Sequence, residues 1–253
     1  MLQKRVLPVL LLQKGGLVKT TKFKQPVYIG DPINAVRIFN DKEADELVIL
    51  DIDAGKTGKE PDYDLLERIA GEAFMPLAYG GAVQNREQVK RLLRMGFEKI
   101  ILNTALHTKP GILKELSQEF ALSTFVAGVD VKSNLFAKYE VYSHAGTKKV
   151  AGQLLDICKR LEEEGAGELL IHSIDRDGTM KGYDINLVQT VSSHLSIPVI
   201  ACGGAGKLEH ITEAHQKTNA AAFAAGSMFV FHGPHKAVLI SYPSYSKLRE
   251  VLR

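Results

Sequence analysis

The segment Glu46-Leu-Val-Ile-Leu-Asp-Ile-Asp53 has a near copy, Glu168-Leu-Leu-Ile-His-Ser-Ile-Asp175, nearly half of the 253-residue chain later. A second pair has almost the same separation, Pro76-Leu-Ala-Tyr-Gly-Gly-Ala82 and Pro198-Val-Ile-Ala-Cys-Gly-Gly-Ala205. Two independent matches at one offset are hard to obtain by chance, and the offset is too long for a solenoid repeat. The sequence therefore predicts a protein made of two similar halves.

Apolar runs alternate with amphipathic stretches in both halves. The expected strands are Arg5–Leu11, Leu47–Ile52, Leu77–Tyr79, Lys99–Leu102, Thr124–Val131, Leu169–Ile174, Val199–Cys202 and Ala221–Ala225. The clearest expected helices are Asp64–Ala73, Arg86–Met95, Gly152–Gly165 and Tyr183–His194. This alternation is typical of a parallel sheet covered on both faces. We predict the α/β class: a (β/α)8 TIM barrel with an internal two-fold half-barrel repeat. A doubly wound open sheet is the alternative, but it does not explain the duplication.

Length and composition agree with one barrel. Residues 1–253 are expected to form a single domain, with half-barrels at roughly 1–120 and 121–253. A net charge of +3 is too small to indicate a nucleic-acid partner. The two cysteines lack CxxC spacing, and Val6–Leu12 fits a buried strand better than a signal peptide or a membrane span. We expect a cytoplasmic protein that makes no membrane contact.

In such a barrel the loops that follow the strands build the functional site. Glycine pairs there let backbone N–H groups approach an anion, and a following helix N-terminus adds its dipole. The candidates are Gly81-Ala82 and Asn103-Thr104 in the first half, and Asp177-Gly178-Thr179, Gly203-Gly204 and Gly226-Ser227 in the second. A lone glycine pair is more often a tight turn, but these pairs take equivalent strand ends. Two anion sites across one mouth would suit a ligand with two phosphates.

Carboxylates also follow the apolar runs. For Asp51, Asp130 and Asp177 the commoner role would be to cap a helix or brace a loop. Asp130 is the best candidate for acid–base chemistry, because partial desolvation is expected beyond a fully apolar strand. His172 lies within a predicted strand, where a lone histidine is usually a packed, hydrogen-bonded core residue. No histidines have a convincing metal-ligand spacing, and we expect neither a metal nor another cofactor.

Several motifs together resemble the cyclase (HisF-like) subunit of imidazole glycerol phosphate synthase along essentially the whole chain. They are Ala44–Ile52, Asn103-Thr104, Ser173-Ile-Asp-Arg-Asp-Gly-Thr179, Gly182-Tyr-Asp184 and Gly203-Gly-Ala-Gly-Lys207. The resemblance implies a lyase of histidine biosynthesis that forms a heterodimer with a glutaminase subunit and receives ammonia from it. The family uses this ammonia to convert an aminoimidazole carboxamide ribulose bisphosphate to imidazole glycerol phosphate and an aminoimidazole carboxamide ribotide.

The resemblance also implies roles for individual residues. Substrate and phosphate binding falls on Lys19, Asp51, Gly81, Ala82, Asn103, Thr104, Asp177, Gly178, Gly204, Gly226 and Ser227. Lys19 matches a lysine of the family's mobile first loop. An ammonia gate at the opposite end of the barrel falls on Arg5, Glu46, Lys99 and Glu168. All four gate positions are retained, which favours a glutaminase partner.

One departure affects the chemistry directly. The family's acid–base pair consists of aspartates at the ends of the first and fifth strands; Asp130 is the second of these, but Leu11 takes the first position. Leucine cannot transfer a proton, and losing one proton-transfer group typically costs ~10²–10⁴-fold in rate. Further departures are Ala82 for a glycine, His172 for a threonine and a different tail after His232. These differences favour a divergent paralogue.

Two functions therefore stay open. The first is a synthase subunit that acts on the phosphorylated aminoimidazole substrate. The alternative is a paralogue without cyclase activity, which docks a glutaminase and channels ammonia, with an ATP-dependent amidotransferase as a further partner, to acetamidino groups on surface-polysaccharide sugars. A sugar-phosphate isomerase is weaker, because the Ser173–Thr179 motif argues against it. The phosphate cradles do not identify the substrate, and no motif sets the oligomeric state without the partner.

Overall fold

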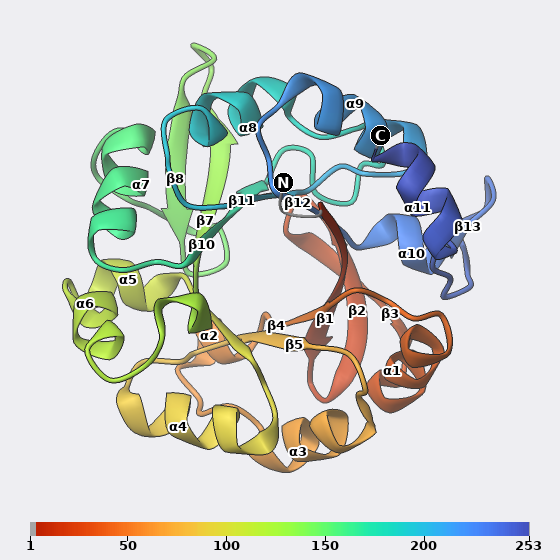
Figure 1. Cartoon of the computed structure of the whole chain (residues 1–253), viewed down its shortest axis with the longest axis horizontal. Coiled ribbons are helices and arrows are strands. Elements are labelled where there is room, and N and C mark those ends of the chain that lie inside the picture. The colour runs from red at the N-terminus through yellow and green to blue at the C-terminus, as the bar shows by residue number, and fades with distance from the viewer. Residues whose placement is uncertain (1–3, 253) are drawn as a thin grey trace.

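The computed structural model describes residues 4–252, apart from the side chains of residues 55 and 56, and contains eight parallel strands closed into a barrel (Figure 1). The barrel strands are β1 (Arg5–Gln13), β4 (Leu47–Asp51), β5 (Leu77–Gly80), β6 (Lys99–Leu102), β7 (Phe125–Ser133), β10 (Glu168–Ser173), β11 (Val199–Cys202) and β12 (Ala222–Ala225). Each pairs in parallel with the next, and β12 pairs with β1. Closure leaves the barrel without an open sheet edge.

Helices surround the barrel and connect its strands (Figure 1). They are α1 (Pro32–Asp41), α2 (Ala54–Thr57), α3 (Tyr63–Glu72), α4 (Arg86–Met95), α5 (Thr104–Thr108), α6 (Ile112–Ser117), the 3₁₀ helix η1 (Leu122–Thr124), α7 (Leu154–Glu163), α8 (Ile185–Ser192), α9 (Leu208–Lys217), α10 (Ser227–Val230) and α11 (Tyr245–Val251). Four begin after a side chain that accepts a hydrogen bond from the N–H three residues later, namely Asp31, Asp62, Asn85 and Asp184. Local sequence thus sets where these helices start.

The hydrophobic core has two layers, because alternate residues of each strand face opposite sides. On β1, Leu7, Val9 and Leu11 belong to the cluster inside the barrel, whereas Val6 and Leu10 belong to the cluster under the helices. The inner cluster is completed by Val18, Val48, Ala78, Ile101, Val126, Leu170, Ile200, Cys202, Ala222 and Ala224. Burial on both sides explains why the strands read as continuous apolar runs.

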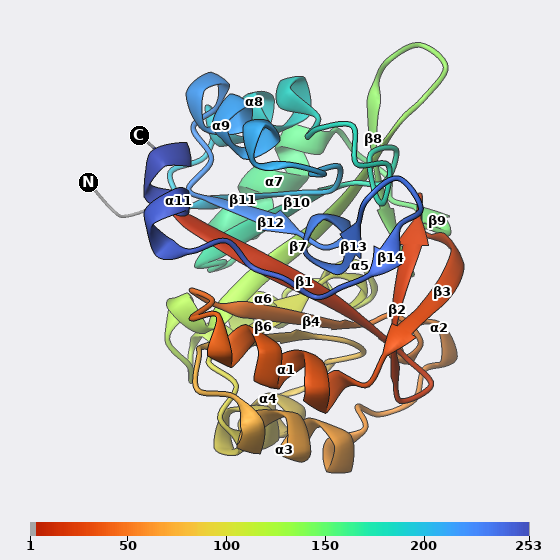
Figure 2. The same cartoon turned by 90° about the vertical axis from the view of Figure 1, so that its right-hand side faces the viewer.

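Antiparallel hairpins extend the C-terminal ends of two barrel strands (Figure 2). They are formed by β2 (Gly16–Thr21) with β3 (Lys24–Gly30), which follow β1, and by β8 (Tyr139–Ser143) with β9 (Lys148–Lys149), which follow β7. A short pair, β13 (Phe231–His232) and β14 (Ala237–Val238), precedes α11. In Figure 2 the β2–β3 and β8–β9 hairpins stand on the right, and α11 lies at the opposite end of the barrel.

The predicted TIM barrel is confirmed, and every expected strand begins and ends within two residues of the observed one. Helix Arg86–Met95 has its predicted bounds. The repeated segments fall on β4 and β10, and on β5 and β11, but the half-barrel repeat and the single domain stay predictions; residues 1–3 and 253 lie outside the described part. The hairpins were not predicted. Within residues 4–252, no helix combines the length and the apolar character that crossing a membrane requires.

Candidate functional site

A cavity of about 630 Å³ opens at the C-terminal ends of the barrel strands. Its wall contains the whole predicted first cradle, Gly81, Ala82, Asn103 and Thr104, together with Asp51 and Asp130. Small-molecule sites commonly measure about 300–1,000 Å³. The cavity is therefore large enough for a substrate of the size of a sugar bisphosphate.

A second cavity, of about 30 Å³, lies beside β11 and β12. Its wall holds the other predicted binding residues, which are Lys19, Asp177, Gly178, Gly204, Gly226 and Ser227. Leu11 and His172 belong to the walls of both cavities. The predicted site residues thus gather at one end of the barrel in two groups, and a ligand that reaches both groups would pass these two side chains.

The first cradle contains two tight backbone positions. A Cβ on Gly81 would lie 2.6 Å from the Tyr79 hydroxyl and 2.7 Å from Asp51 Cβ, so a side chain does not fit there. Ala82 has a φ of 51°, in the left-handed region. A residue other than glycine occupies that region at a cost of about 1–2 kcal/mol. The backbone at position 82 is therefore one that glycine suits better than alanine.

Ala82→Gly is expected to raise the free energy of unfolding by up to about 1.6 kcal/mol. It removes left-handed strain of about 1–2 kcal/mol, and the freer unfolded chain offsets about 0.4–1 kcal/mol of this gain. Thermal denaturation measures the change. Ala70→Gly within α3 is the matched control, which should lose about 1 kcal/mol because it has no strain to relieve. Equal losses in both variants would contradict the strain at Ala82.

Lys19 extends from β2 into the second cradle, which is the group of predicted binding residues that lines the small cavity. Its side chain is buried, its Nζ donates a hydrogen bond to the carbonyl oxygen of Val9, and a Cβ on Gly226 would collide with that Nζ. Burial lowers the pKa of the ammonium to about 8, against the opposing effect of the Asp177 carboxylate. The lysine that the resemblance assigns to a mobile loop thus sits on a hairpin strand, with its amine among the glycines of the cradle.

Inorganic phosphate is expected to bind this cradle less tightly as the pH rises through about 8, because Lys19 loses its charge there. Calorimetric titrations at pH 7 and pH 9 measure the affinity, and Lys19→Met should bind weakly at both. Protein stability should change in the opposite sense. Between about pH 8 and 10.5 the unfolded chain keeps the Lys19 proton that the folded protein loses, because the pKa is lower in the folded state. The free energy of unfolding should therefore rise over this range relative to Lys19→Met. A decline in phosphate affinity that survives in Lys19→Met would contradict this role.

Asp130 lies on β7 at the inner wall of the large cavity. Asn103 Nδ2 donates hydrogen bonds to Asp130 Oδ2 at 3.2 Å and to the carbonyl oxygen of Gly128 at 3.0 Å. Burial raises the pKa of Asp130 to about 6, and the His172 imidazole opposes this rise. A carboxylate that titrates close to neutral pH can both accept and release protons during turnover.

Asp51 acts first as a local brace. Its Oδ1 accepts hydrogen bonds from the N–H groups of Asp53 at 3.0 Å and Ala54 at 2.9 Å, at the start of α2. Burial raises the pKa of Asp51, and these two bonds oppose the rise. Asp51 thus caps a helix start, which is the commoner role of a carboxylate at a strand end. It also lines the large cavity.

Asp177 holds the β2–β3 hairpin over the mouth. Its Oδ2 accepts hydrogen bonds from the Thr20 hydroxyl at 2.8 Å and from the Phe23 N–H at 3.1 Å. A Cβ on Gly178 would collide with the Thr20 carbonyl oxygen, so the hairpin approaches the loop as closely as glycine allows. Thr20 and Phe23 both line the large cavity and were not predicted. The β-branched residues around Thr20 were the only local sign of a strand there.

His172 is buried on β10 between two carboxylates. Its Nδ1 lies 3.9 Å from Asp130 Oδ1, and its Nε2 lies 3.6 Å from Asp177 Oδ1. Burial opposes a charge on the imidazole, but the Cys202 sulfur and the Asp177 carboxylate outweigh it and raise the pKa of His172 well above its usual value. The ring is a buried core residue, as predicted, but among the described residues its Nε2 has no hydrogen-bond partner.

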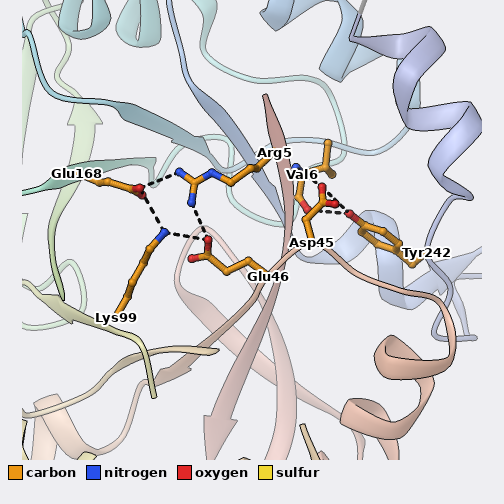
Figure 3. A network of polar contacts seen from close by, with 7 residues as sticks. All are labelled: Arg5, Val6, Asp45, Glu46, Lys99, Glu168 and Tyr242. Atoms are coloured by element: carbon orange, nitrogen blue, oxygen red, sulfur yellow. Dashed lines mark hydrogen bonds and ion pairs between the residues drawn. The ribbon is translucent and has the colours of Figure 1, made fainter. Parts of the chain in front are cut away.

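The four predicted gate residues form a closed ring at the opposite end of the barrel (Figure 3). Arg5 contacts Glu46 at 2.6 Å and Glu168 at 2.9 Å, and Lys99 contacts Glu46 at 2.9 Å and Glu168 at 3.2 Å. Three of these residues begin a barrel strand, and Glu46 directly precedes β4. The alternating charges therefore neutralise one another at the N-terminal ends of the strands.

The C-terminal tail braces the strands that carry the ring. The Tyr242 hydroxyl donates a hydrogen bond to the carbonyl oxygen of Val6 at 2.8 Å and lies 3.4 Å from Asp45 Oδ2 (Figure 3). Val6 and Asp45 are the sequence neighbours of Arg5 and Glu46. The C-terminal tail thus packs beside two ring members.

Large apolar side chains are exposed at the same end. Phe74 is 91% exposed three residues before β5, and Leu122 is 53% exposed in η1, just before β7. A Cβ on Gly167 would collide with the Leu122 backbone, which places Leu122 beside the start of β10. Single exposed apolar side chains are common on protein surfaces, so Phe74 and Leu122 do not by themselves mark an interface.

Comparison with known proteins gives a consistent result. A family model described as histidine biosynthesis protein matches residues 5–235. A Pseudomonas aeruginosa protein provisionally named imidazole glycerol phosphate synthase subunit hisF2 is 46% identical over 98% of this chain and 99% of its own length. A Leptospira borgpetersenii protein provisionally named subunit HisF of that synthase is 49% identical over 96% of both chains. The Exiguobacterium sibiricum protein named imidazole glycerol phosphate synthase subunit HisF, without qualification, is 37% identical over 92% of each.

Proposed function

The chain belongs to the histidine biosynthesis protein family, and we propose that it is the ammonia-using subunit of a glutamine amidotransferase of the imidazole glycerol phosphate synthase type. A glutaminase subunit binds the ring end of the barrel and releases ammonia there. At the mouth, an aminoimidazole carboxamide ribulose bisphosphate reacts with this ammonia. The products are imidazole glycerol phosphate and an aminoimidazole carboxamide ribotide.

The observation that carries this proposal is the closed ring of Arg5, Glu46, Lys99 and Glu168. Side chains of alternating charge at the end of an aliphatic interior are costly to desolvate, and well-packed apolar residues would often stabilise a protein as well or better. A contribution to protein stability therefore does not explain why these four positions carry charged side chains. A ring that opens at one ion pair provides a polar entrance for ammonia, which as a neutral molecule can cross an aliphatic interior that ammonium cannot.

The two ends of the barrel match the two partners of such a reaction. The exposed Phe74 and Leu122 offer apolar contact area for a glutaminase around the ring. At the mouth, the separate glycine-rich groups around Gly81 and Gly204 suit two phosphates of one substrate. Ammonia would then reach the centre of the bisphosphate from inside the barrel, between the two phosphate cradles.

The test measures imidazole glycerol phosphate formation from the aminoimidazole bisphosphate, with either ammonium salt or glutamine plus the cognate glutaminase. We expect product from both nitrogen sources. Lys99→Ala should keep turnover with ammonium salt and lose turnover with glutamine, because it disrupts the entrance and leaves the mouth intact. Lys217→Ala removes an exposed ion pair on α9 and is the matched control. If neither ammonium salt nor glutamine gives product, this reaction is rejected.

A second function is favoured by Leu11, which gives the mouth a leucine where the family has an acid. In that case the chain lacks cyclase activity. It docks the glutaminase and passes ammonia on to an ATP-dependent amidotransferase, which uses it to build acetamidino groups on surface-polysaccharide sugars. The greater identity to two provisionally named relatives than to the unqualified HisF agrees with a divergent paralogue. Glutaminase stimulation without turnover of the aminoimidazole bisphosphate would favour this function, and turnover of that substrate would reject it.

A further inference from the structure

His172 and Leu11 are the two side chains that a two-phosphate ligand reaching both cavities would pass. His172 lines both cavities, as does Leu11, whereas Asp130 lines the large one. The parallel pairing of β7 with β10 sets His172 directly opposite Asp130. The wall between the phosphate cradles therefore presents an imidazole and a carboxylate side by side, next to a leucine that can do no acid–base chemistry.

The surroundings hold this imidazole in one orientation. The Phe23 ring packs edge-on against it, with 4.8 Å between ring centroids. On another side, a Cβ on Gly203 would lie 3.0 Å from His172 Cδ2, so the imidazole fills space that the glycine leaves free. Such packing preorganises a proton donor. A core histidine with a purely structural role would instead be expected to hydrogen-bond through both nitrogens.

The charges around His172 favour the imidazolium form. Asp130 from β7 and Asp177 from the loop after β10 lie within 4 Å of its two nitrogens. Cys202 on β11 is the other titratable neighbour, and Lys19 on β2 lies in the same small cavity and supplies the opposing charge. Two carboxylates outweigh one partly deprotonated amine, so a proton on His172 is stabilised where a proton donor is needed.

We propose that His172 and Asp130 are the acid–base pair of this barrel, with the imidazole supplying the proton transfer that a leucine at position 11 cannot. This inference rests on the proposed function, because that reaction brings ammonia and a ribulose carbonyl to the mouth. His172 and Asp130 are on neighbouring strands, whereas the family's pair spans the first and fifth strands. The chain would therefore have moved one member of the pair within the same mouth.

The proton transfers balance in such a pair. The lone pair of ammonia forms a C–N bond to the carbonyl carbon, and the carbonyl π electrons move to its oxygen. That oxygen takes a proton from the His172 imidazolium, while the Asp130 carboxylate accepts the proton that the nitrogen releases. The step ends with a neutral His172 and a protonated Asp130. The 3.9 Å between Asp130 Oδ1 and His172 Nδ1 exceeds direct hydrogen-bond reach, so the proton returns to His172 through a bridging water, which resets the pair for loss of water from the adduct.

The first test needs no substrate. Nitrogen-15 NMR of labelled histidine in the full chain follows the His172 ring, identified by the signals missing from His172→Gln. We expect an imidazolium at pH 7, and Asp130→Asn should lower its titration midpoint because it removes a negative charge 3.9 Å from Nδ1. Asp41→Asn on α1 should leave the midpoint unchanged. A neutral His172 at pH 7, or a midpoint insensitive to Asp130→Asn, would overturn the pair.

The second test is kinetic and uses the complex with the glutaminase. His172→Gln should lower kcat ~10²-fold or more with little change in KM. Adding Leu11→Asp to His172→Gln should recover at least ten-fold, because a carboxylate then stands beside the same reacting atoms. Wild-type kcat in His172→Gln, or no recovery in the double variant, would overturn the proposal. The wild-type complex could be inactive on this substrate while NMR shows a His172 imidazolium whose midpoint depends on Asp130. That combination would reject the proposed reaction but support the pair.

Discussion

Asp130→Asn is expected to lower turnover with ammonium salt ~10²–10⁴-fold while leaving the barrel folded. Asparagine keeps the shape of the side chain and an oxygen that can accept the hydrogen bond from Asn103. It cannot take the proton that the attacking nitrogen releases. Steady-state kinetics with ammonium salt measure the loss without involving the glutaminase, so a defect in ammonia delivery cannot account for the result.

Stability provides the control for Asp130→Asn. Burial raises the pKa of Asp130 from 3.8 to about 6, so its carboxyl favours the folded state when protonated and loses that contribution as the pH rises through about 6. The asparagine variant should therefore be at least as stable as wild type at pH 7, with the difference disappearing below about pH 4. Wild-type turnover in this variant would exclude Asp130 as the base, and gross unfolding would contradict the stability argument.

Glu46→Gln is expected to destabilise the protein by about 3 kcal/mol, near the lower end of the range for breaking a buried ion pair. One Glu46 oxygen, Oε2, contacts both Arg5 and Lys99, and removing its charge leaves two cations facing a single carboxylate. The lower end applies because the Arg5 side chain is 26% exposed and keeps some hydration. Chemical denaturation measures the change in the free energy of unfolding.

Two variants separate the charge imbalance from other effects of Glu46→Gln. Glu46→Gln combined with Lys99→Met leaves Arg5 paired with Glu168, so this double variant should be more stable than Glu46→Gln alone. Glu213→Gln breaks an exposed pair with Lys217 and should change stability within the error of the measurement. A double variant less stable than the single one would show that lost packing outweighs the uncompensated charge.

The ring and the mouth place different demands on one fold. At the ring, neutrality depends on four residues that lie far apart in the sequence. At the mouth, Asp130, His172 and Lys19 are held in environments that oppose the usual protonation state of a carboxylate, an imidazole or an amine. Perturbed groups that gather in a cavity are typical of functional sites, and stability is commonly lower for keeping them there.

Much of the fold could be predicted because its signals are local or periodic. The runs that became β6 and β11, and the helix Arg86–Met95 with its Asn85 cap, carry their boundaries in their own residues. Strand-end position also predicted which residues would gather at the mouth, since parallel strands bring all their C-terminal ends to one side. The β2–β3 hairpin was missed because neither strand alternates between buried and exposed positions: β2 has four consecutive buried residues and β3 begins with five exposed ones.

By itself, the sequence determined the barrel, the side of the barrel on which the glycine-rich loops meet, and the presence of a leucine, Leu11, near the end of the first strand. Only the tertiary structure decided that Leu11 and His172 stand between two cavities, that His172 faces Asp130 across β7 and β10, and that the four charges at the other end close into a ring. The reason is physical: hydrophobic periodicity is written into neighbouring residues, whereas protonation and ion pairing depend on groups that only strand register and barrel closure bring within a few ångströms.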